Sequence, residues 1–223
     1  MPLAPDAIVR LNLGRLWLSY LKMQIPVHGF LIKHPDGAGL VDTGYGTPLE
    51  LIKDYRPVNA SVADALARHD IHPSDIRWVI NSHLHFDHCG QNAVFPQAPV
   101  YLQHREWENR QQYETPAAWL EYAGARFELL DGDAEVVPGV RVVTTPGHTI
   151  GHHSIEIETT DGPALIAGDA CWTVEMFEGK PPQGPMMDDM PAALRSLQRL
   201  REVKPTAVHF CHDKRTWMHK TAL

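Results

Sequence analysis

Cysteine is scarce in this sequence, and the few cysteines form no recognisable pattern. The 223 residues include three, Cys89, Cys171 and Cys211, with no CxxC spacing between them. An odd number of cysteines without that spacing argues against both a disulfide framework and a structural zinc cluster. We therefore expect a cytoplasmic protein whose thiols are small buried side chains, because free cysteine is commonly buried and inert.

Long apolar runs and clusters of positive charge are also lacking. The apolar N-terminal stretch, residues 11–18, is too short and too charged for a membrane span, and no basic start leads into a small-residue cleavage site. Acidic side chains outnumber basic ones, 27 to 20, and lysines and arginines never cluster beyond two in a row. These observations argue against a membrane protein, an exported protein and a nucleic-acid-binding protein.

The remaining composition is that of an ordinary globular domain. Hydrophobic residues make up 43% of the chain and charged residues 21%, close to average usage. A chain of 223 residues can bury a sizeable core without disulfide bonds. We find no linker and no obvious internal repeat, so we expect residues 1–223 to form a single domain.

Short strands and helices alternate along the chain. Strands are predicted where β-branched and apolar residues lie between turn signals, and helices where apolar residues recur at helical spacing. The predicted strands are residues 27–33, 39–42, 77–82, 100–103, 140–145, 154–158, 164–167 and 207–210. The predicted helices are residues 62–69, 104–112 and 117–123, and a fourth that carries Leu194, Leu197 and Leu200 behind a cap at Asp188 or Asp189. The first two strands form the hairpin that opens the predicted fold.

The run from His83 to His88 carries the strongest functional signal, and it begins where the strand at 77–82 stops. In an extended stretch His83, His85 and Asp87 leave the same face, whereas His88 needs a turn to join them. Imidazole and carboxylate groups are the ligands of an open catalytic zinc site. Isolated loop histidines are usually solvated, but four ligand-type side chains this close together favour metal binding, and the run can serve two neighbouring ions.

Three further ligand-type side chains each lie just after a predicted strand. His148 is on a Gly/Pro loop, and Asp169 and His212 have the same placement after later strands. Singly, each would be weak evidence. Because open α/β sheets gather their sites at strand ends, we expect all three to converge on the run from His83 to His88. The pattern predicts a metal-dependent hydrolase.

The motif His-x-His-x-Asp-His, followed by separate His, Asp and His residues, resembles the metallo-β-lactamase superfamily from residue 41 to His212. The resemblance implies an α/β (α+β) fold, a four-layer αβ/βα sandwich. Within the superfamily the sequence is most similar to N-acyl homoserine lactonases, through residues 81–90, 135–140 and 147–154. By position, the resemblance implies the following ligands: His83, His85 and His148 for one metal ion, Asp87, His88 and His212 for the other, and Asp169 as a bridge, with Asp42 and His152 in supporting positions.

The implied cofactor is a pair of divalent metal ions. Zinc suits these ligands, although His and Asp also accept manganese, iron or cobalt. Two such ions can share a hydroxide that forms near neutral pH and attacks the substrate carbonyl. Asp87 is the nearest candidate to carry a proton to the departing oxygen. The implied reaction opens the ring of an N-acyl homoserine lactone, or hydrolyses a related small-molecule lactone or ester.

One catalytic position departs from the lactonase pattern. Lactonases of this type have a tyrosine three residues after the bridging aspartate, where this sequence has Trp172. The indole can be a weaker donor to the substrate, reshape the pocket or pack in the core. The apolar N-terminal segment around Leu16 and Leu18 has similar alternatives: core, the surface of a homodimer, or the wall of an acyl-chain pocket.

Two other functions stay open. A glyoxalase-II-like thioesterase would use the same metal ions, but it requires a basic pocket for glutathione, and Lys214, Arg215 and Lys220 supply only scattered charge. A catalytically silent metal-binding scaffold has no need for seven matched ligands. A zinc β-lactamase is disfavoured, because the common ones have a cysteine where this chain has Asp169.

Overall fold

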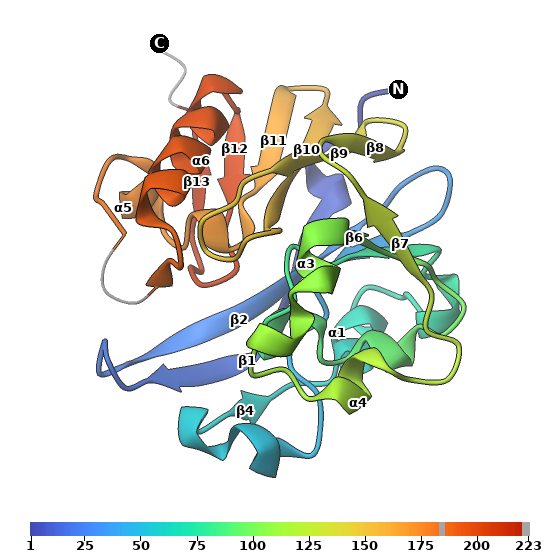
Figure 1. Cartoon of the computed structure of the whole chain (residues 1–223). Helices are drawn as coiled ribbons and strands as arrows, with labels where there is room; N and C mark the ends of the chain where they lie inside the picture. Colours follow the sequence, from blue (N-terminus) through green and yellow to red (C-terminus); the bar gives the residue numbers. More distant parts are fainter. Residues whose placement is uncertain (183–185, 220–223) are drawn as a thin grey trace.

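Two mixed β-sheets form the centre of the molecule, and helices lie on their outer sides (Figure 1). The computed structural model describes residues 1–182 and 186–219. The seven-stranded sheet comes from the first half of the chain, with the strand order β4-β1-β2-β3-β5-β6-β7, and the six-stranded sheet from the second half, with the order β13-β12-β11-β10-β9-β8. This architecture confirms the predicted α+β sandwich. Among the described residues, no helix is long and apolar enough to cross a membrane.

The first half of the chain contains seven strands and four α-helices. The strands are β1 (Ile8–Leu18), β2 (Met23–Ile32), β3 (Gly39–Val41), β4 (Val58–Asn59), β5 (Trp78–Ile80), β6 (Val100–Gln103) and β7 (Phe127–Leu130). The helices are α1 (Val62–Ala67), α2 (Phe86–Cys89), α3 (His104–Glu108) and α4 (Ala117–Leu120). Strands β3, β5, β6 and β7 pair in parallel, so their carboxyl ends meet along one edge of the sheet.

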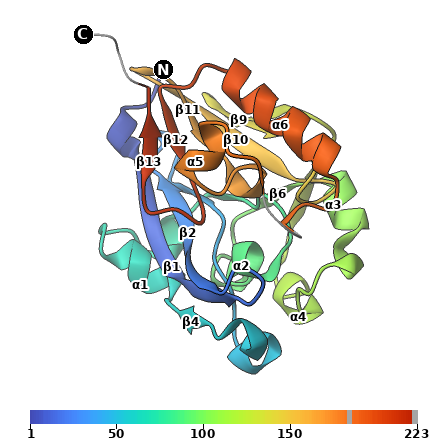
Figure 2. The same cartoon turned by 90° about the vertical axis from the view of Figure 1, so that its left-hand side faces the viewer.

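The described residues of the second half form six strands and two α-helices. The strands are β8 (Ala134–Val137), β9 (Val140–Thr144), β10 (His153–Thr159), β11 (Gly162–Ile166), β12 (Ala207–His209) and β13 (Thr216–Met218). The helices are α5 (Val174–Phe177) and α6 (Met190–Glu202). Helix α6 lies over the outer face of this sheet (Figure 2), and the Asp189 side chain caps it by accepting a hydrogen bond from the Ala192 N–H at 2.9 Å.

The core lies between the inner faces of the two sheets. Phe30, Val41 and Ile80 of the first sheet pack in one cluster with Val142, Ile155 and Ile166 of the second. All six side chains are fully buried, with none of their surface exposed. A shared apolar layer of this kind fixes the two sheets against each other, and so also fixes the loops at their common edge.

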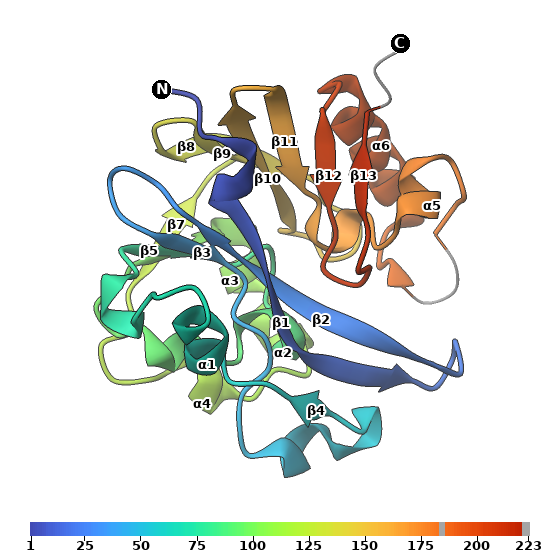
Figure 3. The ribbon, with the colours of Figure 1, turned by 180° about the vertical axis from the view of Figure 1, so that it is seen from behind.

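All eight predicted strands are present, and Asp189 caps its helix as expected. Ser61 caps α1 by accepting a hydrogen bond from the Asp64 N–H at 3.2 Å. The prediction that this hairpin opens the fold was wrong. Strands β2 and β3 do pair, but the fold begins with the longer hairpin β1–β2, which extends away from the rest of the molecule (Figure 3). A bulge between Asn12 and Gly14 interrupts the alternation of apolar residues in β1, which hides the strand from a period-two pattern. A Cβ at residue 14 would lie 2.3 Å from the Tyr45 hydroxyl, so the bulge requires glycine.

Three of the predicted helices are shorter than expected. The helix predicted at 62–69 ends at Ala67, the helix predicted at 104–112 ends at Glu108 and is followed by a 3-10 turn at Arg110–Gln112, and the helix predicted at 117–123 ends at Leu120. Strands β1, β4, β7, β8 and β13 were not predicted. No side chain of strand β7 is fully buried and two of its four are exposed, so its sequence, Phe-Glu-Leu-Leu, lacks the alternation that marks a half-buried strand.

The histidines buried in the fold predict a loss of stability in acid. Burial lowers the pKa of His153 to about 4, and neither nitrogen of its ring has a hydrogen-bond partner. In the unfolded chain this histidine titrates near its ordinary pKa of about 6.5. The unfolded state therefore binds more protons, and the stabilising effect of the neutral ring, fully present above about pH 6.5, is lost as the pH falls toward 4.

We expect the free energy of unfolding of metal-free protein to fall by up to about 3 kcal/mol more in the parent than in His153→Leu between pH 7.5 and pH 4. Urea unfolding curves of both proteins across this range measure the difference. Parallel pH profiles for the two proteins would show that His153 stays unprotonated or finds a partner in acid.

Candidate metal centre

The run from His83 to His88 lies directly after β5, at the edge where the parallel strands end. Residues 83–85 continue the strand as a loop, and the single turn of α2 then begins at Phe86. This turn brings His88 back beside Asp87, with 3.7 Å between His88 Nε2 and Asp87 Oδ2. The expectation that His88 joins the others through a turn is therefore confirmed.

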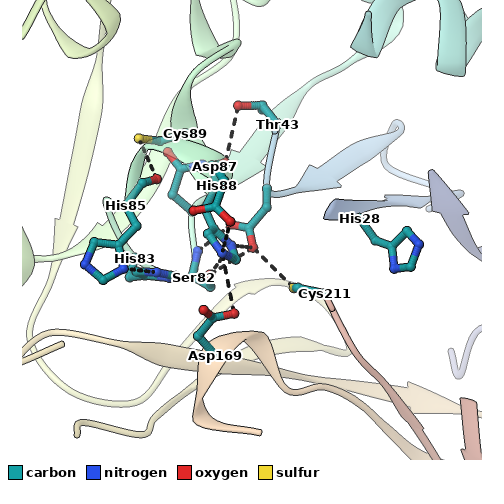
Figure 4. Close-up of polar contacts among 12 residues, drawn as sticks. His28, Thr43, Ser82, His83, His85, Asp87, His88, Cys89, Asp169 and Cys211 are labelled. Atoms are coloured by element: carbon teal, nitrogen blue, oxygen red, sulfur yellow. Dashed lines mark hydrogen bonds and ion pairs between the residues drawn. The ribbon is translucent and has the colours of Figure 1, made fainter. Parts of the chain in front are cut away.

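The ligand-type residues of the second half reach the same place from the opposite sheet. His148 is in the loop between β9 and β10, Asp169 is in the 3-10 turn Gly168–Ala170 after β11, and His212 follows β12. Figure 4 shows Asp169 pointing from the second half toward His88 and Asp87 of the first. The predicted convergence of seven side chains on one site is thus present in the structure.

Three imidazoles form the first cluster. His83 Nε2 lies 3.0 Å from His85 Nδ1, which lies 2.8 Å from His148 Nε2. Ligand nitrogens bound to one tetrahedral zinc ion lie about 3.3 Å apart, given a zinc–nitrogen distance of about 2.0–2.1 Å. The three rings are therefore already gathered close to the spacing of a single ion.

The second cluster consists of Asp87, His88 and His212, whose ligand atoms all lie within 4.8 Å of one another. Asp169 lies between the two clusters. Its Oδ2 is 3.2 Å from His148 Nε2, whereas its Oδ1 is 3.2 Å from His212 Nε2 and 3.4 Å from His88 Nε2. Each carboxylate oxygen thus faces a different cluster, which is the arrangement that a bridging ligand requires.

The buried charges of the site are arranged for metal binding. Burial, reinforced by neighbouring histidines, lowers the pKa of His83 and of His85 well below the ordinary value, so both rings are neutral and can donate a lone pair. Burial would lower the pKa of His88 as well, but the carboxylates of Asp169 and Asp87 raise it well above its usual range. Burial would raise the pKa of Asp169, but His212 and His88 hold it well below its usual range.

Two buried atoms of the ligand-type side chains have no hydrogen-bond partner among the described residues: His88 Nε2 and Asp169 Oδ1. Buried polar atoms without partners are costly and rare in native proteins. The two atoms lie 3.4 Å apart, within reach of a single divalent cation that would satisfy both. The residues therefore fit the metal ions that the sequence pattern implies.

In two of the ligand imidazoles, the nitrogen that faces away from the cluster is fixed by a backbone carbonyl. His148 Nδ1 lies 2.5 Å from the Met186 carbonyl oxygen, and His212 Nδ1 lies 2.8 Å from the Pro26 carbonyl oxygen. A ring nitrogen that donates to a carbonyl leaves the opposite nitrogen free to bind a metal ion. These contacts set the tautomer and direction of both rings.

Asp42 has the same effect on His88. Its Oδ2 lies 2.8 Å from His88 Nδ1 and accepts a hydrogen bond from the Ser82 hydroxyl at 2.8 Å, while its Oδ1 accepts from the Ser82 N–H at 2.8 Å. All three residues are buried. The supporting position predicted for Asp42 is consistent with these contacts, and Ser82, which was not predicted, belongs to the same group.

His152 supports the loop that carries Asp169. Its Nε2 accepts a hydrogen bond from the Asp169 backbone N–H at 2.9 Å, and its Nδ1 lies 2.9 Å from the Thr145 hydroxyl. Both ring nitrogens are therefore occupied by the protein. This geometry agrees with a supporting position and leaves no nitrogen of His152 for a metal ion.

The cysteines are buried thiols, as expected. Burial raises the pKa of Cys171 to about 12 and that of Cys211 to about 12, and it raises the pKa of Cys89 further. Although Cys211 Sγ lies 3.7 Å from Asp42 Oδ2, a protonated thiol is a poor metal ligand. None of the three needs to take part in the metal site.

A pocket of about 270 Å³ opens above the two clusters. We call the apolar and aromatic side chains that line it the apolar wall: Leu16, Leu18, Tyr20, Ile25, Tyr55, Phe86 and Met186. The floor holds His85, Asp87, His148, Asp169 and His212, and Glu114 and Asp188 also line the space. Among the described residues, no lysine or arginine lines the pocket.

Trp172 lines this pocket beside the second cluster. The indole is 6% exposed and lies 4.7 Å from the His212 ring, measured between centroids. Its Nε1 has no hydrogen-bond partner. The side chain thus packs in the core and borders the pocket at the same time, so the alternatives raised by its position in the sequence are not exclusive.

Some residues that organise the site belong to no motif and were not predicted from the sequence. Glu106 is buried behind the ligand loops, and Tyr113 donates a hydrogen bond to it at 3.0 Å while lining the pocket. A single glutamate in a predicted helix carries no sequence signal. Of the scattered C-terminal charges, Arg215 is paired with Glu175 and Asp213, Lys214 does not line the pocket, and Lys220 lies outside the described residues.

Comparison with known proteins identifies the family. A profile of the metallo-beta-lactamase superfamily matches residues 24–212, and the chain belongs to this superfamily. It is a metal-dependent hydrolase. An N-acyl homoserine lactonase from Bacillus sp is 36% identical over 211 residues, which cover 86% of this chain and 82% of the relative.

Solved structures of related proteins have the same fold as this chain. A quorum-quenching N-acyl homoserine lactone lactonase superposes with a TM-score of 0.83 at 31% identity, covering 96% of this chain and 94% of that one. An N-acyl homoserine lactone hydrolase with its product N-hexanoyl-L-homoserine bound at the catalytic metal centre gives a TM-score of 0.82 at 30% identity, over 96% and 95% of the two chains. The match confirms the fold implied by the sequence motifs.

Because the Asp169 carboxylate faces both clusters, Asp169→Asn should reduce the metal content of the purified protein from about two ions per chain to about one or fewer. The control is Asp161→Asn, the same change in the exposed turn between β10 and β11. Elemental analysis of both variants after dialysis measures the content. Equal metal content in the two variants would show that Asp169 is not a ligand.

Proposed function

We propose that this chain hydrolyses lactones, with N-acyl homoserine lactones as the favoured substrates. The pocket carries the proposal, because ligand-type side chains and the apolar wall line the same space. A compact ester ring would lie at the floor, and an acyl chain would lie along the wall. Both the identity to curated lactonases and the product bound at the catalytic metal centre of a related hydrolase support this reading. The proposal treats residues 1–223 as one hydrolase domain.

The proposed ligands are His83, His85 and His148 for one divalent ion and Asp87, His88 and His212 for the other, with Asp169 shared between them. Zinc is the proposed metal, because imidazole and carboxylate donors suit it. Bound ions would supply a water activated near neutral pH and would polarise the ester carbonyl. The two orphaned atoms, His88 Nε2 and Asp169 Oδ1, support this assignment.

Asp87 is the proposed carrier of the proton. Its carboxylate lines the pocket and is 8% exposed, so it can meet both the water and the substrate. Breaking the ring C–O bond leaves an alkoxide, which needs a proton to depart. A carboxylate that receives a proton from the attacking water and delivers it to that oxygen completes the hydrolysis without any other acid.

Trp172 is the proposed donor to the substrate carbonyl. Its indole N–H is buried at the pocket and has no partner within the protein. A preorganised donor of this kind strengthens as negative charge develops on the carbonyl oxygen. The indole N–H would replace the hydroxyl of the tyrosine found at this position in lactonases.

The thioesterase alternative lacks support in the pocket. Glutathione carries carboxylates that require cationic partners, whereas Glu114 and Asp188 line the pocket and lysine and arginine do not. An uncharged acyl lactone meets no such repulsion. The charge of the pocket therefore separates the two functions.

A pH-stat assay of the zinc-loaded protein tests the function directly. We expect turnover of N-acyl homoserine lactones to exceed that of simple aryl esters, and lactoylglutathione to be the poorest substrate because of its negative charge. Preferential hydrolysis of lactoylglutathione would establish the thioesterase instead. A protein that holds two metal ions and turns over none of the three would contradict the hydrolase proposal.

The pair Trp172→Phe and Trp172→Tyr tests the donor. Phenylalanine keeps an aromatic ring but has no N–H, so we expect kcat on lactones to fall by about 10- to 100-fold with the metal content unchanged. Tyrosine restores a donor and should retain much of the activity. If the phenylalanine variant matched the parent in kcat, Trp172 would be only a packing residue.

A further inference from the structure

Glu106 is a completely buried carboxylate behind the metal centre, on α3. Its Oε1 accepts a hydrogen bond from the Leu84 N–H at 2.9 Å. Its Oε2 accepts three, from the Thr149 hydroxyl at 2.8 Å, the Gly151 N–H at 2.9 Å and the Tyr113 hydroxyl at 3.0 Å. Every one of these partners is a donor, so the side chain serves as an acceptor only.

Three of the four donors, from Leu84, Thr149 and Gly151, belong to the two loops that supply the three-histidine cluster. Leu84 stands between His83 and His85, and Thr149 directly follows His148. These loops come from different sheets, because one follows β5 and the other joins β9 to β10. At their bases the His153 N–H donates a backbone hydrogen bond to the Ser82 carbonyl at 3.0 Å. Farther along, the Glu106 carboxylate connects the loop with two of the imidazoles to the loop with the third.

The approach of the second loop to α3 is unusually close. A Cβ at residue 151 would lie 2.3 Å from the backbone nitrogen of Glu106, so only glycine permits the contact. With the loop pressed against the helix, the Glu106 carboxylate reaches the backbone N–H of Gly151 directly. The geometry leaves little freedom for His148 to move relative to His85.

Glu106 does not line the pocket and does not touch the ligand atoms, so it cannot exchange protons with a substrate. Its only path to the pocket is through Tyr113, whose ring lies 5.2 Å from the His85 ring, measured between centroids. The contacts therefore assign it a role in placing other groups.

We propose that Glu106 is a positioning residue that holds the loops of His83, His85 and His148 at the spacing of one metal ion. The inference rests on the ligand set proposed above. Loss of the carboxylate should weaken the three-histidine site more than the other, because among the described residues Glu106 has no hydrogen bond with Asp87, His88 or His212. The effect should appear in metal affinity before any substrate is added.

Thr149→Val and Tyr113→Phe form a matched pair, because each removes one hydroxyl that donates to Oε2. The valine variant loosens a ligand loop, whereas the phenylalanine variant leaves both ligand loops attached. We expect Thr149→Val to weaken the three-histidine site by about 10-fold, and Tyr113→Phe to leave its affinity unchanged. In Glu106→Gln, an amide N–H would face the N–H of Leu84 or Gly151, so a loss of about 10- to 100-fold is expected.

Titration of metal-free protein with Co²⁺, followed by its absorption spectrum, measures both dissociation constants. The site lost in His85→Ala identifies the three-histidine spectrum, and the site lost in His212→Ala identifies the other. Amide hydrogen exchange at residues 84 and 151 provides a second readout, which should quicken in Thr149→Val and Glu106→Gln only. Glu108→Gln, the same change on the exposed side of α3, is the control and should match the parent.

The outcomes separate the two proposals. If the parent binds fewer than two Co²⁺ ions, the ligand set is wrong. If the parent binds two and Thr149→Val weakens both sites equally, or neither, Glu106 does not position the three-histidine site. Selective weakening together with faster local exchange supports the positioning role even if Glu106→Gln fails to fold.

Discussion

A buried negative charge with histidines on both sides is the constraint on which the rest of this structure depends. Asp169 is 2% exposed, and its two oxygens face imidazoles of different clusters at 3.2–3.4 Å. A carboxylate in such a place is stable only where positive charge compensates it. Because those imidazoles come from both halves of the chain, the compensation exists only when the two sheets are packed together. The apolar layer between the sheets and the polar site at their edge therefore stabilise the same arrangement.

Around this charge, the protein controls direction as well as proximity. The rings of His88, His148 and His212 are each held through Nδ1, by Asp42, by the Met186 carbonyl and by the Pro26 carbonyl. His152 holds the turn of Asp169 through a backbone N–H. A carboxylate, two backbone carbonyls and an imidazole thus orient the ligands. Each of them contacts an atom of the ligand residue that does not face the cluster.

The sequence predicted the ligands because they stand in a dense run and at strand ends, where spacing alone is informative. It also predicted the strands whose apolar residues lie between clear turn signals. It did not predict β1, because the bulge at Gly14 disrupts the alternation, or the short exposed β7. Glu106 and Ser82 could not be found from the chain either, since each acts on loops far away in sequence and neither belongs to a repeating pattern.

The hairpin β1–β2 ties the shape of the pocket to the state of the metal centre. Leu18 and Ile25 form part of the apolar wall, and one residue beyond Ile25 the Pro26 carbonyl receives the His212 ring. Adapting the wall to a different ligand is therefore safest toward the tip of the hairpin, at Leu18 or Tyr20. Changes close to Pro26 would alter reactivity along with selectivity, because its carbonyl orients His212. Residues near the tip of the hairpin can therefore vary more freely between related proteins than residues near Pro26.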